Sequence, residues 1–165
     1  MNDPRIGKTI GGCRIESLIG KGGMGAVYLA HQLHLDRKVA VKLLLSSLLG
    51  NEKETKDALV KRFRQEAFFA AKLQHPNAVQ IYDFGEQEDT YYIVMQYIDG
   101  KNLEELLKER GALSIEDCLY IVKEVARALK AAHELGIVHR DIKPANIMMR
   151  RDRSIVVTEI GRAHV

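Results

Sequence analysis

The 165-residue sequence contains no tryptophan, only three prolines and only two cysteines. Cys13 and Cys118 lie far apart and have no histidine at metal-ligand spacing, which excludes a disulfide framework and a zinc site of the usual pattern. We expect both to be small buried apolar residues. The first residues lack the apolar core of a signal peptide, and no apolar run has the length of a membrane span. These absences predict a cytoplasmic domain without a membrane segment, and leave open an anchor elsewhere in a full-length protein.

The charge is nearly balanced, with 25 Lys and Arg, 22 Asp and Glu, and a net charge of +3. The two signs are interspersed and form no basic stripe, so the composition predicts no nucleic acid partner. Hydrophobic residues make up 46% of the chain, enough for a buried core, which excludes compositional disorder. The length fits one domain or two small lobes.

The most informative stretch is His-Arg-Asp-Ile-Lys-Pro-Ala-Asn at residues 139–146, between two short apolar runs. Asp141 can accept a proton from an attacking hydroxyl, and Lys143 can neutralise charge on a phosphoryl group during its transfer. Asn146 offers a neutral oxygen of the kind that Mg²⁺ accepts. The alternative is a solvated turn, which is what mixed charges beside a proline usually form. The stretch nevertheless resembles the catalytic loop of protein kinases, H-R-D-x-x-x-x-N, in every specified position.

A glycine-rich segment, Gly-Lys-Gly-Gly-Met-Gly, occupies residues 20–25. Its pattern G-x-G-x-x-G also occurs in dinucleotide-binding folds, where the last glycine opens a helix. Here residues 13–19 alternate as in a strand, and residues 26–30 are the β-branched, aromatic and apolar types of a second strand. We therefore predict a hairpin whose glycines let backbone amides approach phosphates closely. It resembles the kinase glycine-rich loop, including the following Val27.

A lysine interrupts the predicted strand over residues 37–45. Alternation places Val39, Val41 and Leu43 on one face, and Lys42 on the other face between Ala40 and Leu44. Strand lysines usually face water, but this one has apolar neighbours on both sides. Lys42 therefore needs a partner.

A carboxylate interrupts the apolar stripe of the helix predicted over residues 51–73. Asn51 and Glu54 form a candidate N-cap pair, and Glu66 falls within the stripe of Leu59, Phe63, Ala70 and Leu73. An unpaired buried charge is costly. We therefore predict that Lys42 and Glu66 pair; the alternative, a surface pair of Arg62 with Glu66, leaves Lys42 unexplained.

Further elements are predicted along the rest of the chain. Residues 79–84 and 91–97 have the pattern of strands around the acidic turn 86–89. A helix over 102–110 ends at Gly111, with Asn102 as its N-cap or as a ribose ligand. A longer helix runs to about Leu135. Ser114 and Asp117 cap its start, and Gly136 ends it. The residues expected to face a core are Leu103, Leu106 and Leu107 in the first helix, and Ile115, Leu119, Val122, Val125, Ala126 and Leu129 in the second. A turn at 150–153 leads to a strand at 155–158.

Together these motifs identify the sequence as a member of the Ser/Thr protein kinases of the bacterial eukaryotic-like type, over residues about 10–158. The resemblance implies an α+β, bilobal fold. After a lead-in at 1–12, the first lobe and hinge at 13–98 combine a small antiparallel five-stranded sheet with helix C, and residues 99–158 form an incomplete, mainly helical second lobe. The implied activity transfers the γ-phosphoryl group of ATP, with Mg²⁺, to Ser or Thr hydroxyls of a protein substrate.

The resemblance also assigns roles. Asp141 positions and deprotonates the hydroxyl, Lys143 and Lys42 stabilise charge, Glu66 holds Lys42, and Asn146 binds the metal. Met95 is the gatekeeper. The backbone carbonyl of Gln96 and the backbone amide of Ile98 form hydrogen bonds with adenine. The full set of residues expected at ATP is Ile19, Gly20, Lys21, Gly22, Gly23, Met24, Gly25, Ala26, Val27, Ala40, Lys42, Met95, Gln96 and Ile98.

The chain departs from the family where Asp-Phe-Gly is expected, since it reads Glu159-Ile160-Gly161. A glutamate is one methylene longer and would misplace the metal, so the alternative function is a catalytically dead nucleotide-binding scaffold. The interpretation we favour is that residues 159–165 are not native, because they back-translate to GAG ATC GGA AGA GCA CAC GTC, which contains a common sequencing-adapter sequence. The sequence also lacks an activation segment and peptide-docking elements. It lacks the helices that pack under the 114–135 helix as well, so we expect the apolar face of that helix to be exposed. We also expect residues 1–165 alone to be largely inactive.

Overall fold

The computed structural model describes residues 3–22, 25–44 and 53–158, and the chain divides into two compact units. The first unit comprises Met1–Ala67 and Ile81–Tyr97, and the second comprises Phe68–Gln80 and Ile98–Val165. The chain passes between them three times, and the last passage, at Tyr97–Ile98, falls within the predicted hinge. Residues 68–80 group with the second unit, whereas the sequence places all of 13–98 in the first.

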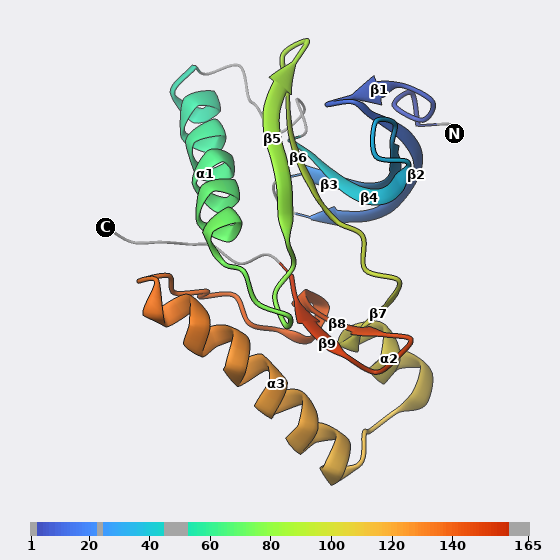
Figure 1. Cartoon of the computed structure of the whole chain (residues 1–165), viewed down its shortest axis with the longest axis vertical. Coiled ribbons are helices and arrows are strands. Elements are labelled where there is room, and N and C mark those ends of the chain that lie inside the picture. Colours follow the sequence, from blue (N-terminus) through green and yellow to red (C-terminus); the bar gives the residue numbers. More distant parts are fainter. Residues whose placement is uncertain (1–2, 23–24, 45–52, 159–165) are drawn as a thin grey trace. The chain divides into compact units, whose positions relative to one another are not determined.

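The first unit is built on an antiparallel sheet in the order β1-β2-β3-β4-β6-β5 (Figure 1). Its strands are β1 (Thr9–Ile10), β2 (Cys13–Gly22), β3 (Gly25–Gln32), β4 (Arg37–Leu44), β5 (Ile81–Gln87) and β6 (Thr90–Gln96). The sheet has six strands rather than the predicted five, because the two-residue β1 also pairs with β2. Strand β5 begins two residues later than predicted and the turn is confined to Glu88 and Asp89, whose φ angles are 49° and 58°.

The alternation of β4 places its two faces in different cores. Val39, Val41 and Leu43 are fully buried with Tyr28 on one side. On the other side Leu44 packs against helix α1 (Lys53–Lys72), whose buried stripe is Val60, Phe63 and Ala67. The predicted helix therefore forms, but Leu59 is only partly buried because the stripe runs through Val60. The predicted N-cap residue Asn51 and the side chain of Glu54 lie outside the described residues.

The N-terminal segment is anchored to the first unit through a buried tyrosine. The hydroxyl of Tyr28, whose side chain is fully buried, donates to Oδ2 of Asp3 at 2.7 Å and accepts a hydrogen bond from Arg5 at 2.9 Å. Burial is the main cause that raises the pKa of Tyr28. The backbone N–H of Arg5 and then the Tyr28 hydroxyl lower the pKa of Asp3. The segment before β2 is thus part of this unit.

A glutamine links the two edges of the six-stranded sheet. Oε1 of Gln87, at the end of β5, accepts from the backbone N–H of Gly11, and its Nε2 donates to the carbonyl of Thr9, both at 3.0 Å. Strands β1 and β5 are opposite edges in the strand order. The Gln87 side chain therefore supplies the polar contacts that a neighbouring strand would otherwise give to β1.

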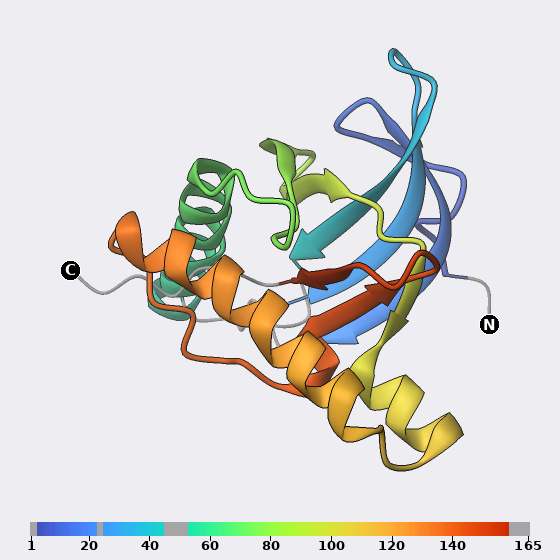
Figure 2. The ribbon, with the colours of Figure 1, turned by 60° about the horizontal axis from the view of Figure 1, so that its bottom comes forward.

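The second unit combines helices with a three-stranded antiparallel sheet in the order β7-β8-β9. Its elements are β7 (Gly100–Asn102), α2 (Leu103–Arg110), α3 (Ile115–Glu134), the 3₁₀ helix η2 (Pro144–Asn146), β8 (Ile147–Arg150) and β9 (Ile155–Val157). Helix α3 packs along β9 (Figure 2). The predicted helix ends are confirmed, since Gly111 and Gly136 follow the helices with φ angles of 77° and 73°. None of the described helices is both long and apolar enough to cross a membrane.

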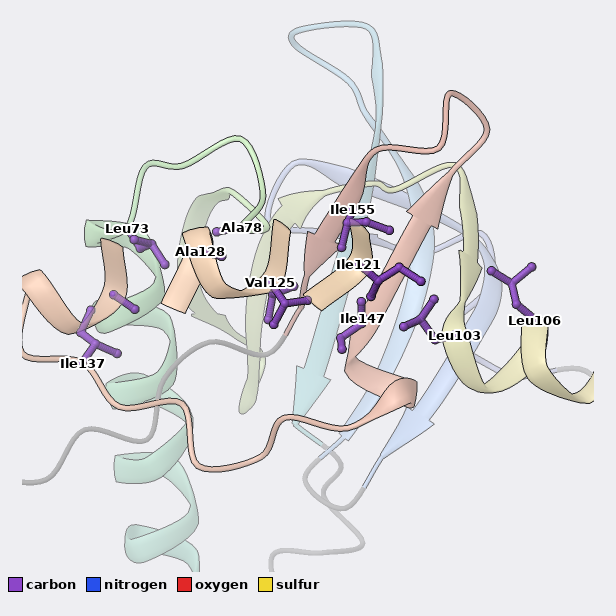
Figure 3. Close-up of a cluster of buried hydrophobic side chains, with 12 residues drawn as sticks. Leu73, Ala78, Leu103, Leu106, Ile121, Val125, Ala128, Ile137, Ile147 and Ile155 are labelled. Atoms are coloured by element: carbon purple, nitrogen blue, oxygen red, sulfur yellow. The ribbon is translucent and has the colours of Figure 1, made fainter. Parts of the chain in front are cut away.

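The core of the second unit uses one of two apolar faces of α3 (Figure 3). Ile121, Val125, Ala128 and Ala132 are buried against residues that include Leu103, Leu106, Ile147 and Ile155. The predicted core positions Ile115, Leu119 and Val122 are instead 76%, 67% and 65% exposed, Ala126 is also exposed, and Leu107 of α2 is 39% exposed. The expected exposure of the apolar face is therefore confirmed at these positions of α3, but not at Val125. Cys118 lies on that exposed side, so the prediction that it is buried is wrong, whereas Cys13 is buried as predicted.

Candidate active site

The predicted contact between Lys42 and Glu66 is present in the first unit. Nζ of Lys42 on β4 donates to Oε1 of Glu66 on α1 at 2.7 Å. The side chains are 7% and 12% exposed, so neither ion is a surface charge. Oε2 of Glu66 is buried and accepts no hydrogen bond from the described residues. The pair holds an ammonium group in place on the α1 side of the sheet.

The register of the strands places the predicted ATP-contacting residues around Lys42. Directly opposed residues of antiparallel strands share a face. Gly20 opposes Val27, Val27 opposes Lys42, and Ala40, two residues before Lys42, opposes Met95. These five residues therefore form a strip across one face of β2, β3, β4 and β6.

Two residues predicted at ATP belong to the other face. Ala26 opposes Lys21 and Leu43, and its side chain is fully buried in the core around Tyr28. The side chain of Lys21 shares that face of the sheet. A ligand bound on the strip would therefore contact the backbone of Lys21 and Ala26 rather than their side chains. The side chains of these two residues point away from the strip because neighbouring side chains alternate along a strand.

The glycine-rich segment forms the predicted hairpin, in which Gly22 opposes Gly25. Gly23 and Met24 lie outside the described residues. A Cβ on Gly25 would lie 2.2 Å from the carbonyl oxygen of Leu43, so the approach of β3 to β4 requires glycine there. A Cβ on Gly22 would meet nothing within 4 Å, and Ile19, at a register shift in β2, is 47% exposed. The end of β2 thus presents bare backbone, which fits close approach by a phosphate.

The predicted hinge residues lie on both sides of the boundary between the units. Met95 and Gln96 are the last two residues of β6. Gln96 opposes Val39, so its side chain is on the other face of the sheet from that of Met95. Ile98 begins the second unit and its side chain is 5% exposed. Asn102 accepts from the backbone N–H of Glu105 at 2.8 Å, and Glu105 accepts from that of Asn102 at 3.0 Å. Of its two predicted roles, the structure shows the N-cap.

Asp141, Lys143 and Asn146 converge in the second unit. Oδ2 of Asp141 accepts from Nζ of Lys143 at 2.9 Å and from Nδ2 of Asn146 at 3.1 Å. Nδ2 also donates to the Asp141 carbonyl at 2.9 Å, so the amide holds both the side chain and the backbone of Asp141. Asn146 is 6% exposed, whereas the Asp141 side chain is 40% exposed. The arrangement presents the Asp141 carboxylate to solvent. The ammonium of Lys143 and the amide of Asn146 both donate to it.

His139 has an architectural position in the loop. It is 2% exposed, and its Nδ1 accepts from the backbone N–H of Asp141 at 3.1 Å. Its Nε2 lies 3.3 Å from the Thr158 carbonyl, a contact that requires the ring proton on Nε2. Thr158 was not predicted as part of this site, yet its N–H and hydroxyl both donate to the Asn146 carbonyl, at 2.9 and 3.1 Å. Nothing in the spacing of the sequence signals that long-range contact.

The chemistry of Asn146 fits a metal ligand. Both of its side-chain hydrogen bonds use Nδ2, so Oδ1 makes no hydrogen bond to the described residues. An amide oxygen of this kind suits Mg²⁺. In the described part of the chain, no group of three or more His, Cys, Asp or Glu residues could hold a metal ion. Glu159, the other residue that the sequence places at the metal, lies outside the described residues.

The family description "Protein kinase domain" matches residues 13–165. The chain belongs to the protein kinase domain family. It is 45% identical to the serine/threonine-protein kinase PrkC of Bacillus subtilis over 96% of this chain and 24% of PrkC. It is 39% identical to PknA of Mycobacterium tuberculosis over 97% of this chain and 37% of PknA.

Solved kinase domains show the same fold. The crystal structure of the M. tuberculosis PknI kinase domain is similar with a TM-score of 0.80 and 32% identity, and the match covers 96% of this chain and 63% of that chain. The chain therefore spans 24% and 37% of these two curated relatives and less than two thirds of a solved kinase domain.

Proposed function

We propose that the protein containing this kinase-domain segment transfers the γ-phosphoryl group of ATP to Ser or Thr hydroxyls of a protein. The observation that carries the proposal is the convergence of Lys143 and Asn146 on one carboxylate oxygen of Asp141. Relatives named serine/threonine-protein kinases, at 45% and 39% identity, support the acceptor class.

In this proposal Asp141 accepts the proton of the substrate hydroxyl as its oxygen bonds to the γ-phosphorus. The bond from that phosphorus to the β–γ bridging oxygen breaks, and ADP leaves with the electron pair. Lys143, already 2.9 Å from Asp141, can shift its hydrogen bond toward the developing phosphoryl charge. His139 acts through the backbone of Asp141 and transfers no proton.

The first unit, together with Ile98, supplies the nucleotide contacts in the same proposal. Lys42, fixed by Glu66, would bind phosphate oxygens, and the backbone around Gly22 would cover them. Val27, Ala40 and Met95 would contact the adenine side, with hydrogen bonds from the backbone of Gln96 and Ile98. Asn146 would hold Mg²⁺, which would neutralise phosphate charge when bound.

The second candidate function is a nucleotide-binding scaffold without catalysis. Glu159 favours it, since the family has Asp at this position and Glu carries an additional methylene. This candidate retains the Lys42–Glu66 pair and the glycine hairpin. It differs from the kinase proposal only in phosphoryl transfer.

Transfer of labelled phosphate to a Ser-containing protein substrate tests the proposal, in a protein that carries this chain within a whole kinase domain. We expect Asp141→Asn to reduce the rate by about 10²–10⁴-fold, the usual contribution of a general base. Asp57→Asn, on the exposed side of α1, is the matched control and should leave the rate unchanged. A rate insensitive to Asp141→Asn would refute the assignment. Activity that appears only with Glu159→Asp would favour the scaffold for the sequence as it stands.

A further inference from the structure

A pocket of about 310 Å³ lies within the second unit, between α2 and the catalytic loop. It is lined by Glu104, Leu107, Lys108, Lys143, Pro144 and Ala145. The α2 residues lie three and four positions apart, so they share one face of that helix. The phosphoryl-transfer mechanism uses the ammonium of Lys143 and none of the other five side chains.

The pocket has apolar walls. Leu107 is 39% exposed although its neighbour Leu106 is buried, so it presents a large apolar side chain to the pocket. Pro144 is exposed and carries no backbone N–H, and Ala145 offers only a methyl group. Because Ala145 is small, the lining leaves room that an incoming side chain can fill.

Lys143 connects the pocket to the proposed acceptor site. Lys143 lines the pocket, and its ammonium lies 2.9 Å from Oδ2 of Asp141. The pocket is thus separated from the catalytic carboxylate by the length of one lysine side chain. An extended peptide advances about 3.3 Å per residue. A substrate side chain in the pocket would therefore belong to a residue within about three positions of the phosphorylated Ser or Thr.

The charges around the pocket disfavour a cation. Two lysines and one glutamate line it, for a formal charge of +1. Nζ of Lys108 lies 3.6 Å from Glu104, whose negative charge it offsets. An arginine or lysine entering the pocket would lose hydration without gaining an unpaired carboxylate.

Resting on the proposed kinase function, we propose that this pocket selects substrates by binding one apolar side chain within about three residues of the acceptor hydroxyl. It disfavours Arg and Lys at that position. The substrate class is thus a Ser or Thr flanked by a leucine-sized residue.

Titration of the ¹⁵N-labelled chain with peptides tests this without requiring catalysis. One set carries a central Ser and a single Leu at each position from −3 to +3 in turn, and a matched set carries Arg. We expect one Leu peptide to shift the amide signals of Leu107, Lys108 and Ala145, with a Kd about tenfold lower than its Arg counterpart, as partial burial of one leucine would give. Equal binding of Leu and Arg peptides at every position, or no binding, would overturn the proposal.

A charge reversal sharpens the test. Lys108→Glu changes the formal charge of the lining from +1 to −1 and should reduce or reverse the preference for Leu over Arg. Lys130→Glu on α3 is the matched control, because Lys130 also forms an exposed i,i+4 pair with a glutamate and lies outside this pocket. An equal effect of both variants would overturn the proposal. Selectivity in the titration without phosphoryl transfer in the whole domain would refute the kinase function alone, and transfer without selectivity would refute this pocket alone.

Discussion

The ammonium of Lys42 on β4 and the carboxylate of Glu66 on α1 form a hydrogen-bonded ion pair at 2.7 Å, with 7% and 12% of their side chains exposed. The two residues are 24 positions apart. Neither ion is well solvated, and the buried Glu66 carboxylate is compensated by the ammonium of Lys42. The pair therefore links α1 to the sheet and fixes the lysine that we propose binds phosphate.

Removing one partner of this pair should strongly destabilise the first unit. Glu66→Leu removes the carboxylate that hydrogen-bonds to the buried ammonium of Lys42, which we expect to cost about 3–5 kcal/mol of unfolding free energy. The double variant Lys42→Met, Glu66→Leu should recover most of that loss. Urea unfolding of wild type, the two single variants and the double variant measures both the loss and the recovery of unfolding free energy. For comparison, Lys101→Met in the exposed pair with Glu109 should cost less than about 1 kcal/mol. Equal costs for the two pairs would contradict our account.

This pair could be predicted from sequence because both residues break an otherwise apolar pattern. Lys42 interrupts a strand of period two, and Glu66 interrupts a helical stripe, so each signals burial and the need for a partner. The loop around Asp141 was equally predictable, since its contacts span only five residues. The contribution of Thr158 was not, because backbone contacts between distant segments leave no mark in the side-chain pattern.

The network of Asp3 and Tyr28 should make stability depend on pH. The folded pKa of Asp3 lies below its ordinary value of 3.8, chiefly through the Arg5 backbone N–H and then the Tyr28 hydroxyl. Its carboxylate therefore adds stability above pH 3.8 that is lost as the pH falls through the folded pKa. Wild type should exceed Asp3→Asn in unfolding free energy at neutral pH, and the difference should shrink under acid. A difference that stays constant down to about pH 2 would contradict this.

Tyr28 should act at the opposite end of the pH range. Burial raises its pKa above the ordinary value of 10.0, so its stabilising effect is present below pH 10 and is lost as the pH rises through the folded pKa. The unfolding free energy of wild type should therefore fall relative to that of Tyr28→Phe in alkali. Parallel pH profiles of the two proteins above pH 10 would show that Tyr28 makes no such contribution.

The Gln87 side chain should protect strand β1 from opening. Gln87→Ala removes the contacts to Gly11 and Thr9, two hydrogen bonds worth about 0.5–1.5 kcal/mol each. Hydrogen exchange at the Gly11 amide should accelerate accordingly. Gln87→Glu is the informative second variant, because it keeps an acceptor for Gly11 and loses the donor to Thr9. If neither variant changes exchange in residues 9–11, the linkage between the sheet edges is not stabilising.

The sequence could not reveal β1 or choose the buried face of α3. Thr9–Ile10 is too short for a recognisable alternation, and its partner Gln87 lies far along the chain. Helix α3 carries two apolar faces, and periodicity alone does not tell which is covered. Val125 was assigned correctly, whereas Leu119 was not, because packing against β8 and β9 rather than hydrophobicity decides between them.

The exposed face of α3 should make this chain prone to self-association. Replacing Leu119 and Val122, 67% and 65% exposed, with glutamine should reduce light scattering on concentration and change the unfolding free energy by less than about 0.5 kcal/mol. Val125→Gln on the buried face should instead destabilise the fold, since it buries an amide in an apolar core. Unchanged scattering of the double variant would show that this face does not drive association.

The central claim is that this chain carries a kinase nucleotide site centred on Lys42, and calorimetric titration with Mg·ATP tests it most directly. We predict Mg²⁺-dependent binding that Lys42→Ala weakens by at least about tenfold, a loss of about 1.4 kcal/mol. Lys38→Ala, an exposed lysine on the same strand, should bind as wild type does. Binding that is absent, independent of Mg²⁺, or equally strong in Lys42→Ala would contradict the claim.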